Sequence, residues 1–287
     1  MEQNIRMVLE NIIHRMALYR EPLKAPDHTI HQSRKSIKRI RAILKMIRDE
    51  AGYSFYFREN RFFRDLSRQL SPARDLSVQV QTLELLEKNC PEEMEAPEVM
   101  HLREHLCSLK EDHFERLTGP GGRLSTYKGE LDRAVFRINN TLYMRDDFVS
   151  IENGISKTYR RARQYLKEIH GDLSNEVFHE YRKYCRYVQY QIELIQPLFP
   201  AVLKGYASAL DDYSKRLGKI RDLQRFEIYL QQELPDLIAD STRENILHAV
   251  EKLGLKYKEG VYKNGGRIFA EKPRNFMDRI HRYWNVQ

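Results

Sequence analysis

A row of basic side chains between residues 31 and 48 is the part of the sequence best suited to chemistry. The segment HQSRKSIKRIRAILKMIR separates into a basic and an apolar face when wound as an α-helix at about 100° per residue. The basic face consists of His31, Arg34, Lys35, Lys38, Arg41 and Lys45. No carboxylate lies between Arg34 and Arg48, so like charges one turn apart repel and destabilise this helix. A polyanion bound to this face would relieve the repulsion.

The spacing of these cations suits a ligand that carries repeated negative charges. A helix with Arg or Lys at every third or fourth position presents one cation per turn, about 5.4 Å apart. Arginine can contact two phosphate oxygens at once, whereas lysine acts as a point charge. Histidine adds a donor that can become charged beside bound phosphate. The expected chemistry is reversible phosphate binding, with an affinity that falls as salt rises.

The elements that position these residues are expected to be helices. The apolar face of the basic helix consists of Ile30, Ile37, Ile40, Ile43, Leu44 and Ile47. Hydrophobic residues make up 41% of the 287 residues, Gly and Pro are sparse, and strand-type alternation is nearly absent, which predicts an all-α fold. Residues 256–268 are expected to be irregular. The expected helices span residues 4–20, 31–52, 55–70, 72–88, 98–117, 126–140, 156–169, 175–195, 206–217 with a continuation to 233, 241–253 and 276–284.

Two short patterns predict where helices begin. Ser71 precedes Pro72, which is typical of an N-cap followed by proline in the first turn. Ser241 and Glu244 have the spacing of a capping box, in which each side chain bonds to a backbone N–H near the other. Both patterns lie directly before a stretch with helical periodicity.

The second half of the chain repeats two motifs of the first half. HQSRKSIK at 31–38 aligns with HEYRKYCR at 179–186, an offset of 148 residues. LSPARDL at 70–76 aligns with LGKIRDL at 217–223, at nearly the same offset. Two motifs in one order at one offset indicate an internal duplication. We therefore expect two antiparallel helical bundles, residues 1–145 and 146–287, related by a pseudo-twofold repeat with a basic channel between them.

Together these segments resemble the CHAD domain, a family named for its histidine and its α-helical fold. The resemblance rests on HQSRKSIKRIR, on the second copy continued to Tyr190 and Glu193, on the two Arg-Asp-Leu segments, on TYRRAR at 158–163 and on FAEKP before Phe276. It covers nearly the whole chain and implies a single CHAD-like domain, residues 1–287. It further implies non-catalytic binding of inorganic polyphosphate in the basic channel, with association to polyphosphate granules.

Most of the binding residues are expected from the two basic helices. The first wall would consist of His31, Arg34, Lys35, Lys38, Arg39, Arg41 and Lys45. The second wall would consist of His179, Arg182, Lys183, Arg186 and Tyr190, with Arg160, Arg163 and Arg15 from neighbouring helices. No metal and no cofactor is expected. Inorganic polyphosphate is the expected partner, shorter oligophosphates remain open, and neither chain-length preference nor oligomeric state follows from the sequence.

Three features admit other interpretations. A basic arc also suits a nucleic-acid backbone, but base-stacking aromatic residues would then be expected, and the two arcs show only Tyr190. His101, Glu104 and His105 match the H-x-x-E-H pattern of zinc peptidases, but neighbouring charges indicate a solvated face and no third ligand helix is evident. The Arg-Asp pairs at 74–75 and 221–222 are more simply structural, since the aspartate stabilises a helix start and holds a nearby cation.

Composition limits the remaining classes of protein. Lys and Arg number 49 against 41 Asp and Glu, and the resulting net charge of +8 agrees with an anionic partner. Cys90, Cys107 and Cys185 are odd in number and form no CxxC, which argues against a disulfide scaffold. The first residues lack the apolar segment of a signal peptide, and no run approaches the roughly 18 apolar residues of a membrane span. We expect a cytoplasmic protein without membrane contact.

Overall fold

The fold is all-α in every part of the chain that the structure, a computed structural model, describes: residues 5–18, 26–119, 121–122, 124–145, 147–169, 173, 176–232, 234 and 237–286. The all-α prediction is therefore confirmed. The helices are α1 (Ile5–Leu18), α2 (Pro26–Met46), α3 (Arg48–Ala51), α4 (Tyr53–Gln69), α5 (Ser71–Asn89), η1 (Glu92–Met94), α6 (Pro97–Thr118), α7 (Leu124–Thr141), α8 (Val149–Glu168), α9 (Glu176–Ile195), η2 (Gln196–Leu198), α10 (Pro200–Gln232), α11 (Asp240–Lys258), α12 (Val261–Ile268) and α13 (Pro273–Asn285). None of these helices is long and apolar enough to cross a membrane.

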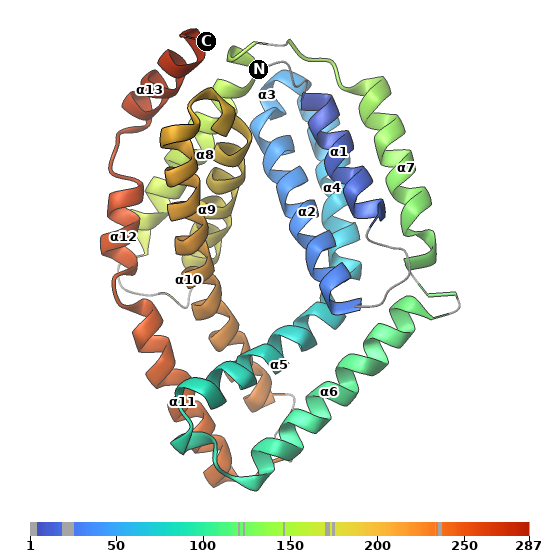
Figure 1. Cartoon of the computed structure of the whole chain (residues 1–287), viewed down its shortest axis with the longest axis vertical. Coiled ribbons are helices and arrows are strands. Elements are labelled where there is room, and N and C mark those ends of the chain that lie inside the picture. The colour runs from blue at the N-terminus through green and yellow to red at the C-terminus, as the bar shows by residue number, and fades with distance from the viewer. Residues whose placement is uncertain are drawn as a thin grey trace.

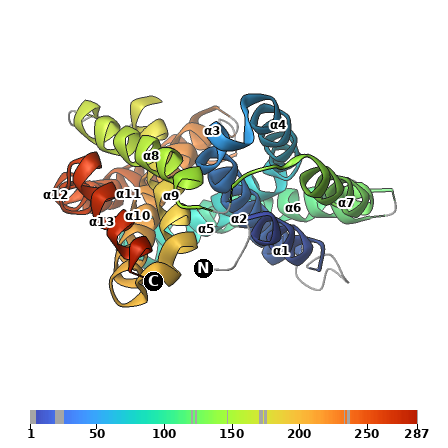
Figure 2. The ribbon, with the colours of Figure 1, turned by 90° about the horizontal axis from the view of Figure 1, so that it is seen from above.

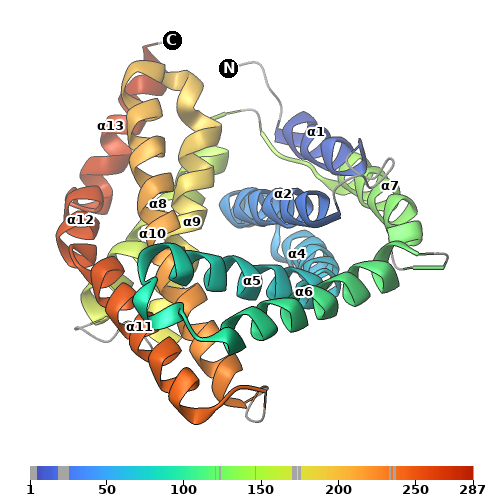
Figure 3. The same cartoon turned by 60° about the horizontal axis from the view of Figure 1, so that its bottom comes forward.

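The helices form two groups that meet along α2 and α9. Figure 1 shows α1, α2, α4 and α7 on one side and α8, α9, α10, α12 and α13 on the other, with α5, α6 and α11 below. In the view from above, α2 and α9 lie where the two groups meet, and α3 lies beside α2 (Figure 2). Helices α5 and α6 cross the lower end side by side, and α11 runs beside the end of α10 (Figure 3).

Buried apolar residues form two clusters, which the long helix α10 connects. The larger cluster joins α1, α2, α4 and α7 to α8, α9, α12 and α13, and it includes Leu9, Phe63, Tyr159 and Phe276. The smaller cluster lies between α5, α6, α11 and the second half of α10. Helix α10 contributes its residues up to Ile220 to the larger cluster and its later ones to the smaller. The basic helices α2 and α9 both belong to the larger cluster.

The two copies of the Arg-Asp-Leu motif lie in different local structure. In the first copy the chain breaks at Leu70, and α5 begins at Ser71 with Pro72 in its first turn. In the second copy α10 continues through the motif without a break, because Lys219 stands where the first copy has Pro72 and retains its backbone N–H. The expected N-cap role of Ser71 is wrong, since Leu70 occupies the N-cap and makes no side-chain cap bond.

The stretch 256–268, expected to be irregular, is helical. Helix α11 continues to Lys258, and α12 covers Val261–Ile268. Gly265 serves close packing, since a Cβ on it would lie 2.6 Å from the hydroxyl of Tyr213 and 2.8 Å from that of Tyr181. The capping box at Ser241 is also wrong, because Ala239 is the N-cap of α11 and makes no side-chain cap bond.

Helices α2, α8 and α9 approach one another closely and fix the two basic helices relative to each other. A Cβ on Gly154 of α8 would lie 1.7 Å from the carbonyl oxygen of Met46, so only glycine permits this crossing with α2. The buried amide of Gln191 on α9 donates to the Ala42 carbonyl at 3.0 Å and to the Thr158 hydroxyl at 3.3 Å. The separation between the basic faces is therefore set by packing rather than by the charged side chains.

Candidate polyanion-binding site

Helix α2 separates its apolar and basic residues as the sequence predicts. The residues Ile30, Ile37, Ile40, Ile43, Leu44 and Ile47 are at most 3% exposed, which confirms the expected apolar face. The basic residues opposite retain solvent contact, and His31 and Lys38 are exposed. Helix α9 follows the same plan, since Tyr181, Cys185, Val188 and Ile192 are buried. The burial of one face thus orients the other toward solvent.

Lys38 lies where the basic residues of both sequence halves converge. Desolvation by surrounding protein, followed by repulsion from Arg182, Arg34 and Arg186, lowers the pKa of Lys38 to about 7. Asp222 opposes this effect without cancelling it. The residue as a whole keeps exposed surface, but its amine is strongly desolvated, which places the amine between protein surfaces rather than on a convex one. The structure therefore brings together cations of α2 and α9 that lie about half the chain apart.

The two histidines of the repeat lie beside these cations and are held in the neutral form. Desolvation, followed by repulsion from Arg74 and Lys38, lowers the pKa of His31 to about 4. Desolvation, followed by repulsion from Arg221, also lowers the pKa of His179. The Nδ1 atom of His179 is buried and has no hydrogen-bond partner among the residues that the structure describes. A bound anion would favour the charged imidazolium at both positions.

Arg34 and Arg182 occupy equivalent positions but have different partners. Arg34 donates at 2.6 Å to both the Ser67 carbonyl and the Ser71 hydroxyl. Gly218 stands where the first copy has Ser71, and a Cβ built on it would lie 3.6 Å from a terminal nitrogen of Arg182. The second copy therefore lacks the hydroxyl acceptor. The buried Nε of Arg182 has no hydrogen-bond partner in the described part of the chain, and desolvation lowers the pKa of Arg182.

The two Arg-Asp motifs border the same cluster of cations. Asp75 binds Arg225 through contacts of 2.8 and 3.0 Å, which joins α5 to α10. Arg74 donates to Asp27 at 3.2 Å. Arg74 and Arg225 both lower the pKa of Arg34, after the larger effect of desolvation. Asp75 holds a nearby cation, as expected, but the expected helix-start role of the two aspartates is wrong, because the first turn of α5 has no acidic residue and Asp222 lies inside α10. The arginines enlarge the basic cluster, which the sequence pattern does not show.

Polar bridges hold the other end of the α9 face. Arg186 donates to Gln189 at 2.7 Å and to Asp211 at 3.0 Å. Arg39 crosses from α2 to bind Glu193 at 2.9 Å, and its guanidinium lies 5.5 Å from the ring centre of Tyr190. Tyr190 is buried, so its ring supports the arginine rather than facing solvent. These bonds fix the guanidinium groups in place before a ligand arrives.

Five tyrosines surround the cations at the Lys45 end of α2, and we call them the tyrosine cluster: Tyr53, Tyr56, Tyr165, Tyr184 and Tyr187. The Lys45 ammonium lies 5.9 Å from the ring centre of Tyr56 and 5.7 Å from that of Tyr184. The Tyr184 ring packs against Tyr165 and Tyr187, with ring centres 5.4 and 5.8 Å apart. The aromatic residues expected to be lacking beside the basic face are therefore present. They come from α4, α8 and α9, and the residue pattern of a single helical face does not show them together.

The remaining predicted residues differ in whether they add to the basic cluster or contact other parts of the protein. Lys35 contributes to the lowered pKa of His31, and Lys183 pairs with Glu180 while adding to the positive charge around Lys45. Arg41 donates to Asn60 at 3.0 Å. Arg163 is directed elsewhere, since its Nε donates to the Phe269 carbonyl at 3.1 Å.

Arg160 and Arg15 are exposed, and no contact links either to the cluster within the described residues. From α8 it is Arg161, outside the predicted set, that adds to the positive charge around Lys45. The adjacent residue of the TYRRAR segment therefore faces the basic cluster. The apolar residues Ile155, Tyr159 and Ala162 are buried and fix which face of α8 points inward. Their positions are the sequence signal that separates Arg161 from Arg160.

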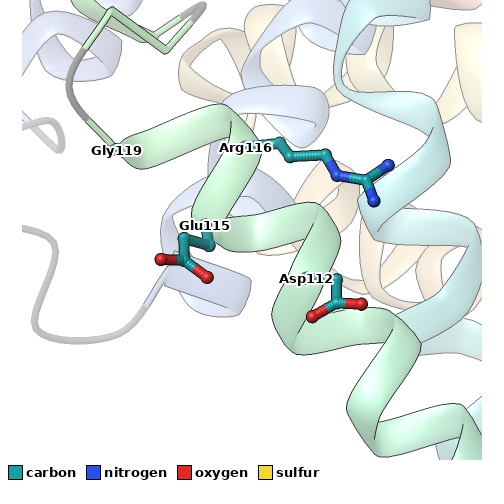
Figure 4. A pocket seen from close by; sticks show the side chains of 4 residues that line it. All are labelled: Asp112, Glu115, Arg116 and Gly119. Atoms are coloured by element: carbon teal, nitrogen blue, oxygen red, sulfur yellow. The ribbon is translucent and has the colours of Figure 1, made fainter.

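Two other places on the molecule offer less to a ligand. Among the described residues no group of three or more His, Cys, Asp or Glu could hold a metal ion, and this includes the surroundings of His101 and His105 on α6. An open hollow near the end of α6 is lined by Asp112, Glu115, Arg116 and Gly119 (Figure 4). Two carboxylates against one guanidinium make this hollow unsuited to a polyanion.

A comparison with known families supports the resemblance seen in the motifs. The CHAD domain profile matches residues 8–231, well over half of the chain. The chain belongs to the CHAD domain family. The matched region contains α2 and α9 with both copies of the basic motif. No curated protein matches this CHAD domain in a direct sequence comparison.

Proposed function

We propose that this CHAD domain binds inorganic polyphosphate without catalysis, in a basic channel between two helical bundles related by an internal repeat. The family is linked to polyphosphate binding, and the cations converging on Lys38 from both repeats are the observation that supports the proposal most. A linear polyphosphate offers closely spaced anionic oxygens and no groups for sequence recognition. The site offers closely spaced guanidinium and ammonium groups, which can bind such oxygens.

Electrostatic strain in the free protein gives the physical reason for binding. Lys38 faces Arg182, Arg34 and Arg186, and each of these lowers its pKa by more than Asp222 raises it. A polyanion that neutralises this cluster would remove the repulsion and favour the charged lysine. It would also supply acceptors for Nε of Arg182 and Nδ1 of His179, both of which are buried and have no hydrogen-bond partner among the described residues.

Titration of the purified protein with long-chain polyphosphate at roughly physiological salt tests this function. We expect Lys38→Glu/Arg182→Glu to weaken binding at least tenfold, because hydrogen bonds to charged groups contribute about 1.5–3 kcal/mol each. Lys38→Glu alone provides a second test, since Lys38 is exposed and its replacement leaves the core intact. Circular dichroism before each titration checks that the variants are folded.

Lys128→Glu/Arg133→Glu on α7 is the matched control, because both side chains are exposed and the net-charge change is the same. This control should bind polyphosphate as the unmodified protein does. Equal weakening in both double variants would show that net charge alone drives binding, and it would contradict the proposed site.

Single-stranded DNA as a competitor separates the proposed function from its alternative, binding of a nucleic-acid backbone. We expect polyphosphate to stay bound when DNA is added in equal phosphate concentration. Equal displacement would favour the nucleic-acid interpretation. Shortening of the polyphosphate during incubation would contradict non-catalytic binding. Binding of this kind would also bring the protein to polyphosphate granules, which fluorescence microscopy of the tagged protein can test against the Lys38→Glu variant.

A further inference from the structure

The tyrosine cluster adjoins the polyphosphate site but has a different chemistry. Its rings come from α4, α8 and α9, and they surround Lys45, Arg48 and Lys183. Inorganic phosphate has no flat surface to place on an aromatic ring. A site for phosphate alone therefore makes no use of the exposed ring surface that this cluster retains.

Tyr53 presents the most accessible ring of the cluster. It is 56% exposed, and its ring centre lies 5.3 Å from the Arg48 guanidinium and 6.1 Å from the ring centre of Phe57. Phe57 is itself 61% exposed, and its ring also contacts Tyr56. Two exposed aromatic rings beside a cation form a surface on which a planar base can stack.

Positive charge continues from this surface to Lys38. Repulsion from Arg48, Lys183 and Arg161 follows desolvation among the causes that lower the pKa of Lys45. The nearby carboxylates are Glu180, which pairs with Lys183, and Asp49, which binds Arg48 at 3.2 Å. Lys45 and Lys38 lie two turns apart on α2, about 10 Å along its axis. A short phosphate chain can therefore start beside the tyrosines and extend toward Lys38.

We propose that the tyrosine cluster is a base-binding subsite, and that the protein binds nucleoside triphosphates with the base stacked on Tyr53 and the triphosphate directed along α2 toward Lys38. The proposal rests on the proposed function for its phosphate-binding half. It adds a second ligand class, because the base is recognised by ring stacking that an inorganic chain cannot make. Oligonucleotides share the base but lack the triphosphate.

Calorimetric titrations with adenosine triphosphate and with inorganic tripolyphosphate, both without divalent cations, measure the contribution of the base. We expect adenosine triphosphate to bind roughly 5- to 150-fold more tightly, the range that stacking of one base on an aromatic side chain produces. Tyr53→Ala should bring the ratio of the two affinities to about one. Tyr53→Phe should preserve it, because the ring remains.

Phe136→Ala on α7 is the matched control, since this aromatic residue is 70% exposed and belongs to another helix. It should leave the ratio unchanged. If Tyr53→Ala weakens both ligands by the same factor, the ring only holds Arg48 in place, and the proposal is overturned. A deoxyadenosine oligonucleotide that binds more tightly than the triphosphate, with the same dependence on Tyr53, would overturn it in favour of single-stranded nucleic acid.

Long-chain polyphosphate in the same series keeps the two proposals separate. If long-chain polyphosphate binds, and adenosine triphosphate and inorganic tripolyphosphate bind with equal affinity, only the base-binding subsite is contradicted. If neither long-chain polyphosphate nor tripolyphosphate binds, the proposed function fails as well.

Discussion

Lys38 shows how a single side chain can couple ligand binding to pH. Desolvation and three guanidinium groups lower the pKa of its amine to about 7, so the free protein holds the amine partly uncharged near neutrality. The basic face of α2, with Lys38 on it, could be predicted from helical spacing alone. The lowered pKa could not, because it depends on Arg182 and Arg186, which only the packing of α2 against α9 brings near.

Polyphosphate binding should weaken as pH rises through about 7. The bound polyanion favours the ammonium form, so binding takes up a proton above the pKa of free Lys38, and affinity can fall by up to about tenfold per pH unit. His31, with its pKa lowered to about 4, stays neutral in the free protein over this range. Titrations at several pH values check the slope. Lys38→Arg should give a flatter profile with binding retained, and parallel profiles would contradict the role of Lys38.

The helices themselves are the feature that the sequence predicts best. Their apolar periodicity depends on local spacing, which is why the face of α2 and most helix positions agree with the structure. The predictions for Pro72 and Pro197 agree with the structure, since Pro72 lies in the first turn of α5 and α9 ends before Pro197. Predictions based on Ser and Gly are less successful, because tertiary contacts decide the outcome. Ser71 accepts a bond from Arg34 instead of capping α5, and Gly265 permits close packing instead of interrupting a helix.

Gly154→Ala should destabilise the protein strongly, because the added Cβ would lie 1.7 Å from the Met46 carbonyl and force α8 away from α2. We expect a loss of about 3 kcal/mol in the free energy of unfolding, the upper part of the range for overpacking. Gly205→Ala on α10 is the control, since nothing lies within 4 Å of the added Cβ. It should stabilise the protein by about 0.5–1 kcal/mol through helix propensity. Chemical denaturation measures both changes, and equal effects would contradict a close helix crossing.

On the scale of the whole molecule, the basic cluster draws its residues from both halves of the chain. Lys38 and Arg34 come from α2, Arg182 and Arg186 from α9, and Arg225 from α10. The duplicated motifs predicted that both halves would contribute. They did not predict the tyrosine cluster, because its members lie on three helices, α4, α8 and α9, whose relative placement no single-helix pattern records.

The number of cations that contact a polyanion should appear in the salt dependence of binding. We expect the logarithm of affinity to fall linearly with the logarithm of salt concentration, because each neutralised phosphate releases counterions. Lys38→Gln/Arg182→Gln should reduce the slope by about 1.4, at roughly 0.7 per lost contact to a flexible chain. Lys128→Gln/Arg133→Gln should leave it unchanged. An unaltered slope in the first variant would show that these two residues do not contact the ligand.

The composition of the larger hydrophobic cluster has a consequence for how the protein is made. Leu9 near the start of the chain and Ile280 near its end belong to the same cluster. A ribosome adds about 5–20 residues per second, so the first helices wait tens of seconds or less for their last packing partners to emerge. During that time the apolar face of α2 has no α9 against it and α8 has no α13, and nascent chains should depend on chaperones that shield such surfaces until synthesis is nearly complete.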